Sequence, residues 1–291
     1  MIDYHLHLWE HPDKAVEFTI DTLAQYCQKA ESLGIKQIAI TEHFHRFKQS
    51  TDWLGNFWAK FDDADLYQSM EVYFDHHATY DIEDYLNVAI EAKNAGLPIV
   101  VGLEMDYFKD SMHFLNEKLR QYPFDVILGS VHWLKNWRFD DLYDKVSMKV
   151  WDSGDLENIW LNYCYHMEEL SSSASCDVLA HPDLIKVNAN LIKDPAVITE
   201  FNTRIAESAN KYDLAAEVSS AGFRKPVNEQ YPSIDLLSLF LKNDVPITTA
   251  SDAHKISDIG FRFESIKTLI RDFNVQKLAT FTNRKRQFVD V

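Results

Sequence analysis

The chain has 291 residues, of which 46% are hydrophobic, and it carries a formal net charge of −16 at pH 7. This length and composition predict a single domain over residues 1–291 with a substantial core. The acidic charge disfavours a nucleic-acid partner, and no apolar run approaches the ~18 residues of a membrane-spanning helix.

Short apolar runs alternate with longer amphipathic runs along the chain. The predicted strands cover residues 1–6, 36–41, 98–103, 125–131, 177–180, 214–219 and 246–250. The predicted helices include residues 19–33, 82–95, 156–171, 195–212 and 234–242, with Gly34 and Gly96 placed as C-terminal caps of the first two. Seven strands alternating with helices predict an α/β fold with a parallel sheet, closed as a (β/α) barrel. A doubly wound open sheet is the alternative.

Two further segments of the sequence bear on organisation and location. Residues 45–80, rich in aromatic residues and Asp, show no clear pattern and are interpreted as an insertion or a lid over one end of the barrel. Its histidines, His45, His76 and His77, are expected to be solvated. The three widely spaced cysteines and the absence of a signal-peptide pattern at the N-terminus favour a reducing cytoplasm. The sequence does not indicate an oligomeric state.

The histidines follow a pattern that single residues would not reveal. Six predicted strands carry a histidine or a carboxylate at or just past their carboxyl ends: His5 and His7, then His43, Glu104, His132, His181, and finally Asp252 with His254. Active sites of barrels and open α/β sheets are built at the carboxyl ends of the strands. One such histidine is more often structural, but the agreement of six strand ends favours a metal site.

The kinds of ligand indicate the kinds of metal. Imidazole nitrogen and carboxylate oxygen, without a thiolate, suit Zn²⁺, Mn²⁺ or Fe²⁺. Eight or nine candidates are too many for one tetrahedral ion, so the sequence predicts two or three divalent ions. Closely spaced ions lower the pKa of a shared water and hold a phosphoryl oxygen, which suits hydrolysis of a phosphate ester.

The motifs, in chain order, resemble those of the polymerase and histidinol phosphatase (PHP) superfamily over nearly the full length. They are Asp3-Tyr4-His5-Leu6-His7, Thr41-Glu42-His43, Glu104, His132, His181 and Ser251-Asp252-Ala253-His254. The resemblance implies a distorted seven-stranded (β/α) barrel with a trinuclear metal centre. Within the superfamily the chain looks like a histidinol-phosphate phosphatase, on residues 102–107, 129–134 and 217–226. The last segment is similar to Asn-Thr-Ser/Ala-Gly-Leu-Arg-Lys, with Val218-Ser219 in place of Asn-Thr and Phe223 in place of Leu.

The resemblance also implies how the ligands are divided. One ion would be held by His5, His7, Glu104 and Asp252, a second by a bridging Glu104 with His132 and His181, and a third by His43, His254 and a histidine of the loop after the first strand. That loop histidine can only be His11, four residues after His7, whereas the related enzymes usually place it about six residues after.

The hypothesis for the reaction is attack by a metal-bridging hydroxide on L-histidinol phosphate, a small phosphate monoester. Arg224 is expected to grip the phosphate in two-pronged fashion, with Lys225 as a weaker candidate. Either Asp252 or His254 would pass a proton to the leaving oxygen. Glu217 is interpreted either as a partner of the substrate ammonium or as a structural residue. Trp133 either stacks on the substrate imidazole or packs in the core.

Three rival functions remain open at this point. A phosphomonoesterase for another small metabolite is the main competitor, because the metals explain phosphate capture alone. A nuclease of the same superfamily is disfavoured by the acidic charge and by the lack of a basic stripe. A non-catalytic metal-dependent binding protein is disfavoured by the complete ligand set.

Overall fold

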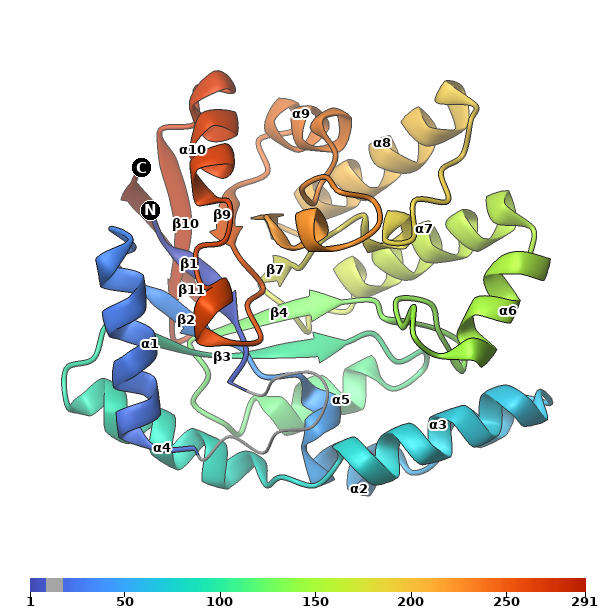
Figure 1. The fold of residues 1–291 in the computed structure, drawn as a ribbon, viewed down its shortest axis with the longest axis horizontal. Coiled ribbons are helices and arrows are strands. Elements are labelled where there is room, and N and C mark those ends of the chain that lie inside the picture. Colours follow the sequence, from blue (N-terminus) through green and yellow to red (C-terminus); the bar gives the residue numbers. More distant parts are fainter. Residues whose placement is uncertain (9–17) are drawn as a thin grey trace.

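The computed structural model describes residues 1–8 and 18–291. Seven parallel strands form the central sheet and follow one another in chain order (Figure 1). They are β1 (Asp3–Leu6), β2 (Ile38–Ile40), β3 (Ile99–Asp106), β4 (Val126–Ser130), β7 (Val178–Leu179), β8 (Ala215–Ser219) and β9 (Ile247–Ala250). All seven lie within the predicted strands except β3, which runs three residues further.

The last strand returns to the first and nearly closes the sheet. The backbone N–H of His7 donates to the carbonyl of Ala253 at 2.8 Å, and the hydroxyl of Thr249 donates to the carbonyl of Ile2 at 2.6 Å. These bonds join β1 to β9 and to the loop after it. The prediction of a (β/α) barrel is therefore confirmed, and the open-sheet alternative is wrong.

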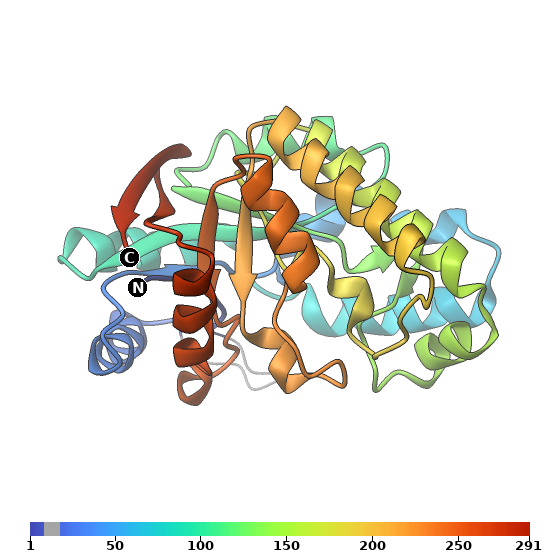
Figure 2. The ribbon, with the colours of Figure 1, turned by 90° about the horizontal axis from the view of Figure 1, so that it is seen from above.

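Helices cover the outside of the sheet, as Figures 1 and 2 show. They include α1 (Ile20–Ser32), α4 (Ile82–Asn94), α5 (Met112–Leu119), α6 (Lys145–Ser153), α7 (Leu156–Ser172), α8 (Pro195–Lys211), α9 (Ile234–Lys242) and α10 (Phe263–Asp272). The two predicted C-terminal glycines, Gly34 and Gly96, have φ of +72° and +93°. At the start of α1 the Thr19 hydroxyl accepts from the N–H of Thr22.

The segment 45–80, expected as an insertion or lid, is helical. It contains α2 (Lys48–Leu54), α3 (Ala64–His77) and the short helix η2 (Phe57–Lys60), and η1 (Phe44–Arg46) reaches into its start. Trp58 and Phe74 are buried and stack with ring centroids 4.5 Å apart. Part of this segment therefore belongs to the core, while its role as a lid stays a prediction.

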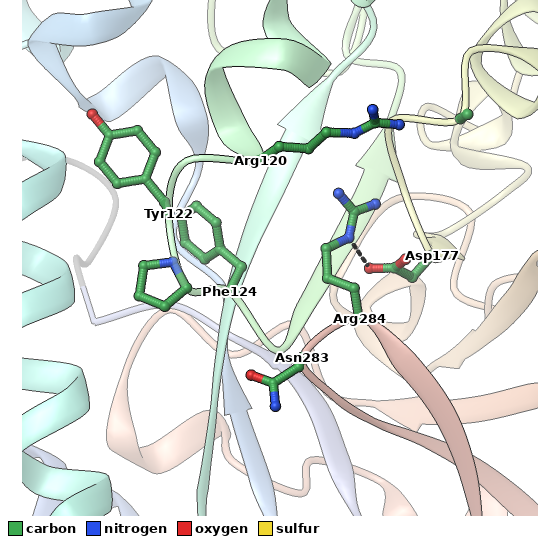
Figure 3. A pocket seen from close by; sticks show the side chains of 8 residues that line it. Arg120, Tyr122, Phe124, Asp177, Asn283 and Arg284 are labelled. Carbon is green, nitrogen blue, oxygen red and sulfur yellow. Dashed lines mark hydrogen bonds and ion pairs between the residues drawn. The ribbon is translucent and has the colours of Figure 1, made fainter.

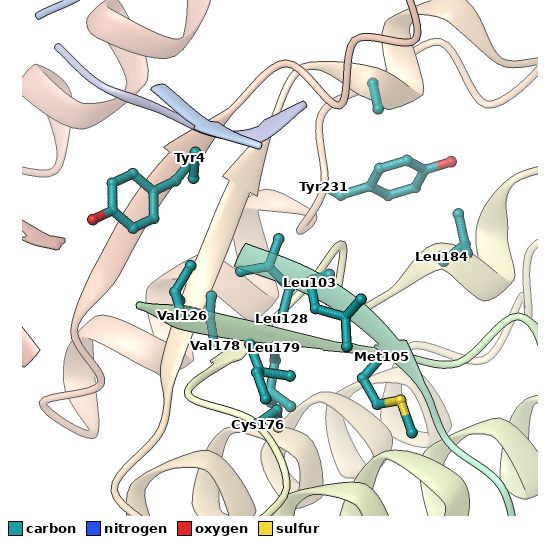
Figure 4. Close-up of a cluster of buried hydrophobic side chains, with 14 of the residues drawn as sticks. Tyr4, Leu103, Met105, Val126, Leu128, Cys176, Val178, Leu179, Leu184 and Tyr231 are labelled. Carbon is teal, nitrogen blue, oxygen red and sulfur yellow. The ribbon is translucent and has the colours of Figure 1, made fainter. Parts of the chain in front are cut away.

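The core lies between the barrel and its helices. Figure 4 shows Leu103, Leu128 and Val178, from three neighbouring strands, in one buried cluster with Cys176. Side chains alternate along a strand, so Leu103 on β3 faces the helices while Glu104 faces the inside of the barrel. Both faces of β3 are buried, as expected for a parallel strand covered on each side.

The cysteines and helices bear on two further expectations. Cys27, Cys164 and Cys176 are free and buried, which agrees with their interpretation as small apolar residues. Among the described residues, no helix has the length and apolar character needed to span a bilayer.

Candidate metal centre

Eight of the nine predicted ligands meet at the carboxyl end of the barrel. They come from the ends of β1, β2, β3, β4, β7 and β9 and are His5, His7, His43, Glu104, His132, His181, Asp252 and His254. Four overlapping groups of three have their ligand atoms within 4.8 Å of one another: His7–His43–His254, His5–Glu104–His181, His5–His7–Asp252 and His43–Glu104–His132. The ninth, His11, lies outside the described residues.

Glu104 occupies the middle of this cluster and is fully buried. Its Oε2 lies 2.6 Å from Nδ1 of His43 and 3.2 and 3.4 Å from Nε2 of His5 and His7. Its Oε1 lies 3.0 Å from Nε2 of His181 and 3.5 Å from Nε2 of His132. Burial favours the neutral acid, but the facing imidazoles, His43 foremost, hold the pKa of Glu104 well below its usual range. One carboxylate therefore faces five imidazoles with both of its oxygens.

Asp252 faces the same cluster from the loop after β9. Its Oδ1 lies 3.3 Å from Nε2 of His7 and 3.5 Å from Nδ1 of His254. Its backbone has φ of +50°, in the left-handed region that aspartate tolerates better than most residues. This conformation directs the carboxylate toward the end of β1.

The donor atoms fit a group of divalent ions. Nε2 of His5, Nε2 of His7 and Oε2 of Glu104 are buried and have no hydrogen-bond partner of good geometry among the described residues. Buried polar atoms are rarely left without a partner, and such a set of converging atoms is what a metal ion satisfies. The absence of thiolate and the mixture of nitrogen and oxygen suit Zn²⁺, Mn²⁺ or Fe²⁺.

Further carboxylates surround the cluster and hold its imidazoles. Nδ1 of His5 lies 2.7 Å from Oε2 of Glu217, which is fully buried, and Oε1 of Glu217 accepts from the N–H of His181. Both oxygens of Glu217 are thus engaged behind the ligands. These contacts support the structural alternative for Glu217, while its contact with a substrate ammonium stays a prediction.

Asp106 and His45 lie beside the cluster, although the sequence analysis assigned neither of them to the site. Asp106 accepts from Nδ1 of His132 and lies 3.2 Å from Nδ1 of His45. Burial raises the pKa of Asp106 to about 6. Burial lowers the pKa of His132, but the neighbouring carboxylates of Asp106 and Glu104 outweigh it and raise this pKa to about 10. His45 is buried and stacks on His43 at 4.5 Å, so the expectation that it is solvated is wrong. The period of two after Glu104 was the available signal for Asp106.

Arg224 reaches the centre from the short helix η4 (Ala221–Arg224). Its Nη2 donates to the carbonyls of Ser251 and Asp252 at 2.8 and 2.7 Å. Its Nη1 is buried and has no hydrogen-bond partner of good geometry among the described residues. The guanidinium is therefore fixed beside Asp252, and its Nη1 can donate to a bound ligand. Lys225, by contrast, is exposed.

Trp133 lies in β5 (Trp133–Leu134), a strand that forms a short hairpin with β6 (Trp137–Arg138). Its side chain is buried and stacks on Phe108 at 5.7 Å, with His45 against it edge to face at 5.3 Å. Trp133 therefore packs in the core, and its stacking on a substrate imidazole stays a prediction.

A separate cavity of about 430 Å³ opens at the other end of the barrel (Figure 3). Its walls include Phe124 and Asp177, which precede β4 and β7, and Arg284, whose Nε bonds to Asp177 at 2.9 Å. The metal-ligand candidates follow the strands instead, so this cavity is not part of the cluster.

Comparison with known proteins places the chain among phosphatases. The PHP domain family model matches residues 4–221. The probable histidinol-phosphatase of Deinococcus radiodurans is 32% identical over 200 residues, which are 68% of this chain and 74% of that protein. The histidinol-phosphatase of Lactococcus lactis is 22% identical over 288 residues, 98% of this chain and 95% of that protein. A crystal structure of histidinol phosphate phosphatase from L. lactis, in complex with zinc, L-histidinol and phosphate, has the same fold, with a TM-score of 0.70, 19% identity and 98% coverage of both chains.

Proposed function

The chain belongs to the PHP domain family, and on this premise we propose that it hydrolyses L-histidinol phosphate to L-histidinol and phosphate in histidine biosynthesis. The observation that carries the hydrolase chemistry is the buried carboxylate of Glu104 with five imidazole nitrogens within 3.5 Å. The choice of substrate rests on the relatives. The two that were compared are named as a probable histidinol-phosphatase and a histidinol-phosphatase, and each aligns with two thirds or more of this chain.

The site takes two or three divalent metal ions, and the proposed ligands are the eight clustered residues. When bound, the ions supply positive charge for the phosphoryl oxygens and a water of lowered pKa. Among the four groups, His5–His7–Asp252 coincides with the division that the family resemblance implies. Assigning the other two ions to His132 with His181 and to His43 with His254 remains part of the proposal, as does His11 as a further ligand.

Arg224 is the proposed phosphate-binding residue. Its Nη2 is fixed by two carbonyls, so the guanidinium cannot turn freely, and Nη1 remains available to a phosphoryl oxygen. A charged donor that is fixed before the substrate arrives loses little entropy on binding. It also stabilises the negative charge that develops on the phosphoryl oxygens in the transition state. Lys225 is exposed and has the weaker claim to a phosphate contact.

Asp252 and His254 are the proposed groups for proton transfer. Hydrolysis forms one bond from a water oxygen to phosphorus and breaks the bond from phosphorus to the alcohol oxygen, which takes up a proton that the water gives up. The carboxylate of Asp252 is 15% exposed and the side chain of His254 is 22% exposed, whereas Glu104, His5 and His7 are fully buried. These two are therefore the members of the cluster that a leaving oxygen can reach from the solvent side.

Phosphate release from a panel of substrates tests the proposal. The purified chain, loaded separately with Mn²⁺, Zn²⁺ or Fe²⁺, is assayed for phosphate release from L-histidinol phosphate and other small phosphomonoesters, and for nucleotide release from single-stranded DNA. We expect the highest kcat/KM on L-histidinol phosphate and its loss in Asp252→Asn prepared in parallel, which controls for contaminating phosphatases. Equal or higher kcat/KM on another monoester would reduce the function to a general phosphomonoesterase, and a preference for DNA would overturn it.

A further inference from the structure

The carboxyl-terminal hairpin has one covered strand and one uncovered strand. β10 (Lys277–Thr282) pairs with β11 (Lys285–Asp290) over six residue pairs without a bulge. The hydroxyl of Tyr4, at the base of the barrel, donates to the carbonyl of Phe281 and accepts from its N–H, so β10 lies against the barrel. β11 lies on the outer side of β10, and Figures 1 and 2 show it at the margin of the molecule. In the part of the chain that the structure describes, the outer edge of β11 has no strand beside it.

Exposed apolar side chains lie among the charged side chains of this edge strand. Phe288 is 53% exposed, Val289 is 38% exposed, and Val291, which follows the strand, is 49% exposed. Soluble proteins generally block a free edge with proline, a bulge, charged side chains or a covering loop, because its unpaired N–H and C=O groups attract a further strand. β11 has neither proline nor bulge, and Arg286 and Asp290 carry opposite charges, so a second copy of the same strand can pair with this edge and match its charges.

The hydrogen bonds of the hairpin determine which residues can pair outward. The N–H of Val291 donates to the carbonyl of Gln276 at 3.2 Å, next to the last pair of the ladder. In an antiparallel ladder, residues that bond to the neighbouring strand alternate with residues whose backbone groups point away from it. Counting back from Val291, the N–H and C=O groups of Arg286, Phe288 and Asp290 therefore point outward.

We propose that β11 is the interface of a symmetric homodimer, in which two copies of β11 pair antiparallel across a two-fold axis at Phe288. Phe288 then faces Phe288 of the second copy, and Arg286 faces Asp290 twice, once on each side of the axis. Opposite charges and aromatic side chains in directly facing positions stabilise an antiparallel pair. A symmetric contact of this kind uses the same surface on both copies and leaves no free edge at the dimer contact.

The competing registers are less favourable. A shift by one residue would require the backbone groups of Gln287 and Val289, which already bond to β10. A shift by two residues would place Phe288 opposite Arg286 or opposite Asp290 and would no longer pair Arg286 with Asp290. The guanidinium of Arg286 also contacts Asp213 of its own chain, which holds it near the edge. The charges therefore select the register with Phe288 on the axis.

Sedimentation equilibrium of the full, metal-loaded chain over a wide concentration range tests the dimer. We expect reversible dimerisation, and Asp290→Arg should weaken it about tenfold or more, since it places two arginines opposite each other at each end of the register. Asp152→Arg makes the same charge change at an exposed position of α6 and should leave the dimerisation constant unchanged. A wild-type chain that stays monomeric, or an Asp290→Arg variant that dimerises as tightly as Asp152→Arg, would overturn the proposal.

Cysteine crosslinking tests the register, whether or not Asp290→Arg folds well. Facing residues of a bonded antiparallel pair have Cα atoms about 5.5 Å apart, within the range for a disulfide. Phe288→Cys should therefore crosslink to a covalent dimer on mild oxidation, and Gln287→Cys should not, because it lies diagonal to its own copy. The native cysteines are buried and provide a low background. Crosslinking of Gln287→Cys in place of Phe288→Cys would refute this register.

Discussion

Replacing Glu104 by glutamine is the most informative single change in the centre. Glutamine keeps the size of the side chain, so the packing of β3 is preserved, but it removes the negative charge and one of the two acceptor oxygens. In the structure Oε1 and Oε2 face different imidazoles, His181 and His132 on one side and His5, His7 and His43 on the other. The change therefore affects every ion that the cluster shares.

The size of the effect follows from the burial of this carboxylate. Removing one partner of a buried charge network costs about 3–5 kcal/mol, since the remaining groups keep their desolvation penalty. At about 1.36 kcal/mol for each tenfold change in rate, a loss of this size in the transition state lowers kcat roughly 10²- to 10⁴-fold. Because an oxygen that faces the ions is replaced by an amide, the number of bound metal ions should also fall.

The assay combines kcat on L-histidinol phosphate, metal content by inductively coupled plasma mass spectrometry and circular dichroism as a test of folding. Glu117→Gln makes the same chemical change on α5, where the side chain is 64% exposed, and should leave all three measurements at wild-type values. A folded Glu104→Gln variant with near-normal kcat and full metal content would refute the shared role of this carboxylate.

Three further changes separate the parts of the account. Glu217→Gln should lower metal affinity about 10- to 100-fold by releasing His5, and excess metal should restore most of the activity; activity loss with unchanged metal affinity would speak for a substrate contact instead. Arg224→Ala should lower kcat/KM about 10- to 150-fold, as expected for lost charge-assisted hydrogen bonds worth about 1.5–3 kcal/mol, with metal content unchanged; an equal loss in Lys225→Ala would contradict this division. Leu128→Ala in the core should cost about 2–5 kcal/mol of unfolding free energy in urea, against less than about 1 kcal/mol for the half-exposed Leu161→Ala.

The sequence was informative where a single physical rule relates the position of a residue in the chain to its location in the fold. Parallel strands bring their carboxyl ends to the same rim, so His5, Glu104 and His181 could be grouped although they lie far apart in the chain. The helices with strong caps, such as the one after Thr19, were predicted within a residue or two for a similar reason. Their boundaries depend on side chains close in sequence.

The sequence was least informative where tertiary contacts decide. Strand β3 extends to Asp106 because it pairs with β4 from Gly102 onward, and this pairing places Asp106 beside His132. Glu217 lies in a predicted strand and Glu104 directly follows one, and only the fold separates the carboxylate inside the cluster from the one behind it. The carboxyl-terminal hairpin turns at Asn283 and Arg284, both with positive φ, without the glycine that usually marks such a turn.

Anomalous diffraction from crystals of the manganese-loaded chain tests the central claim most directly. We expect two or three manganese peaks at the carboxyl end of the barrel, with both oxygens of Glu104 and the Nε2 atoms of His5 and His7 within coordination distance of them. A single peak, or peaks that Glu104 does not contact, would contradict a shared metal centre built around this carboxylate.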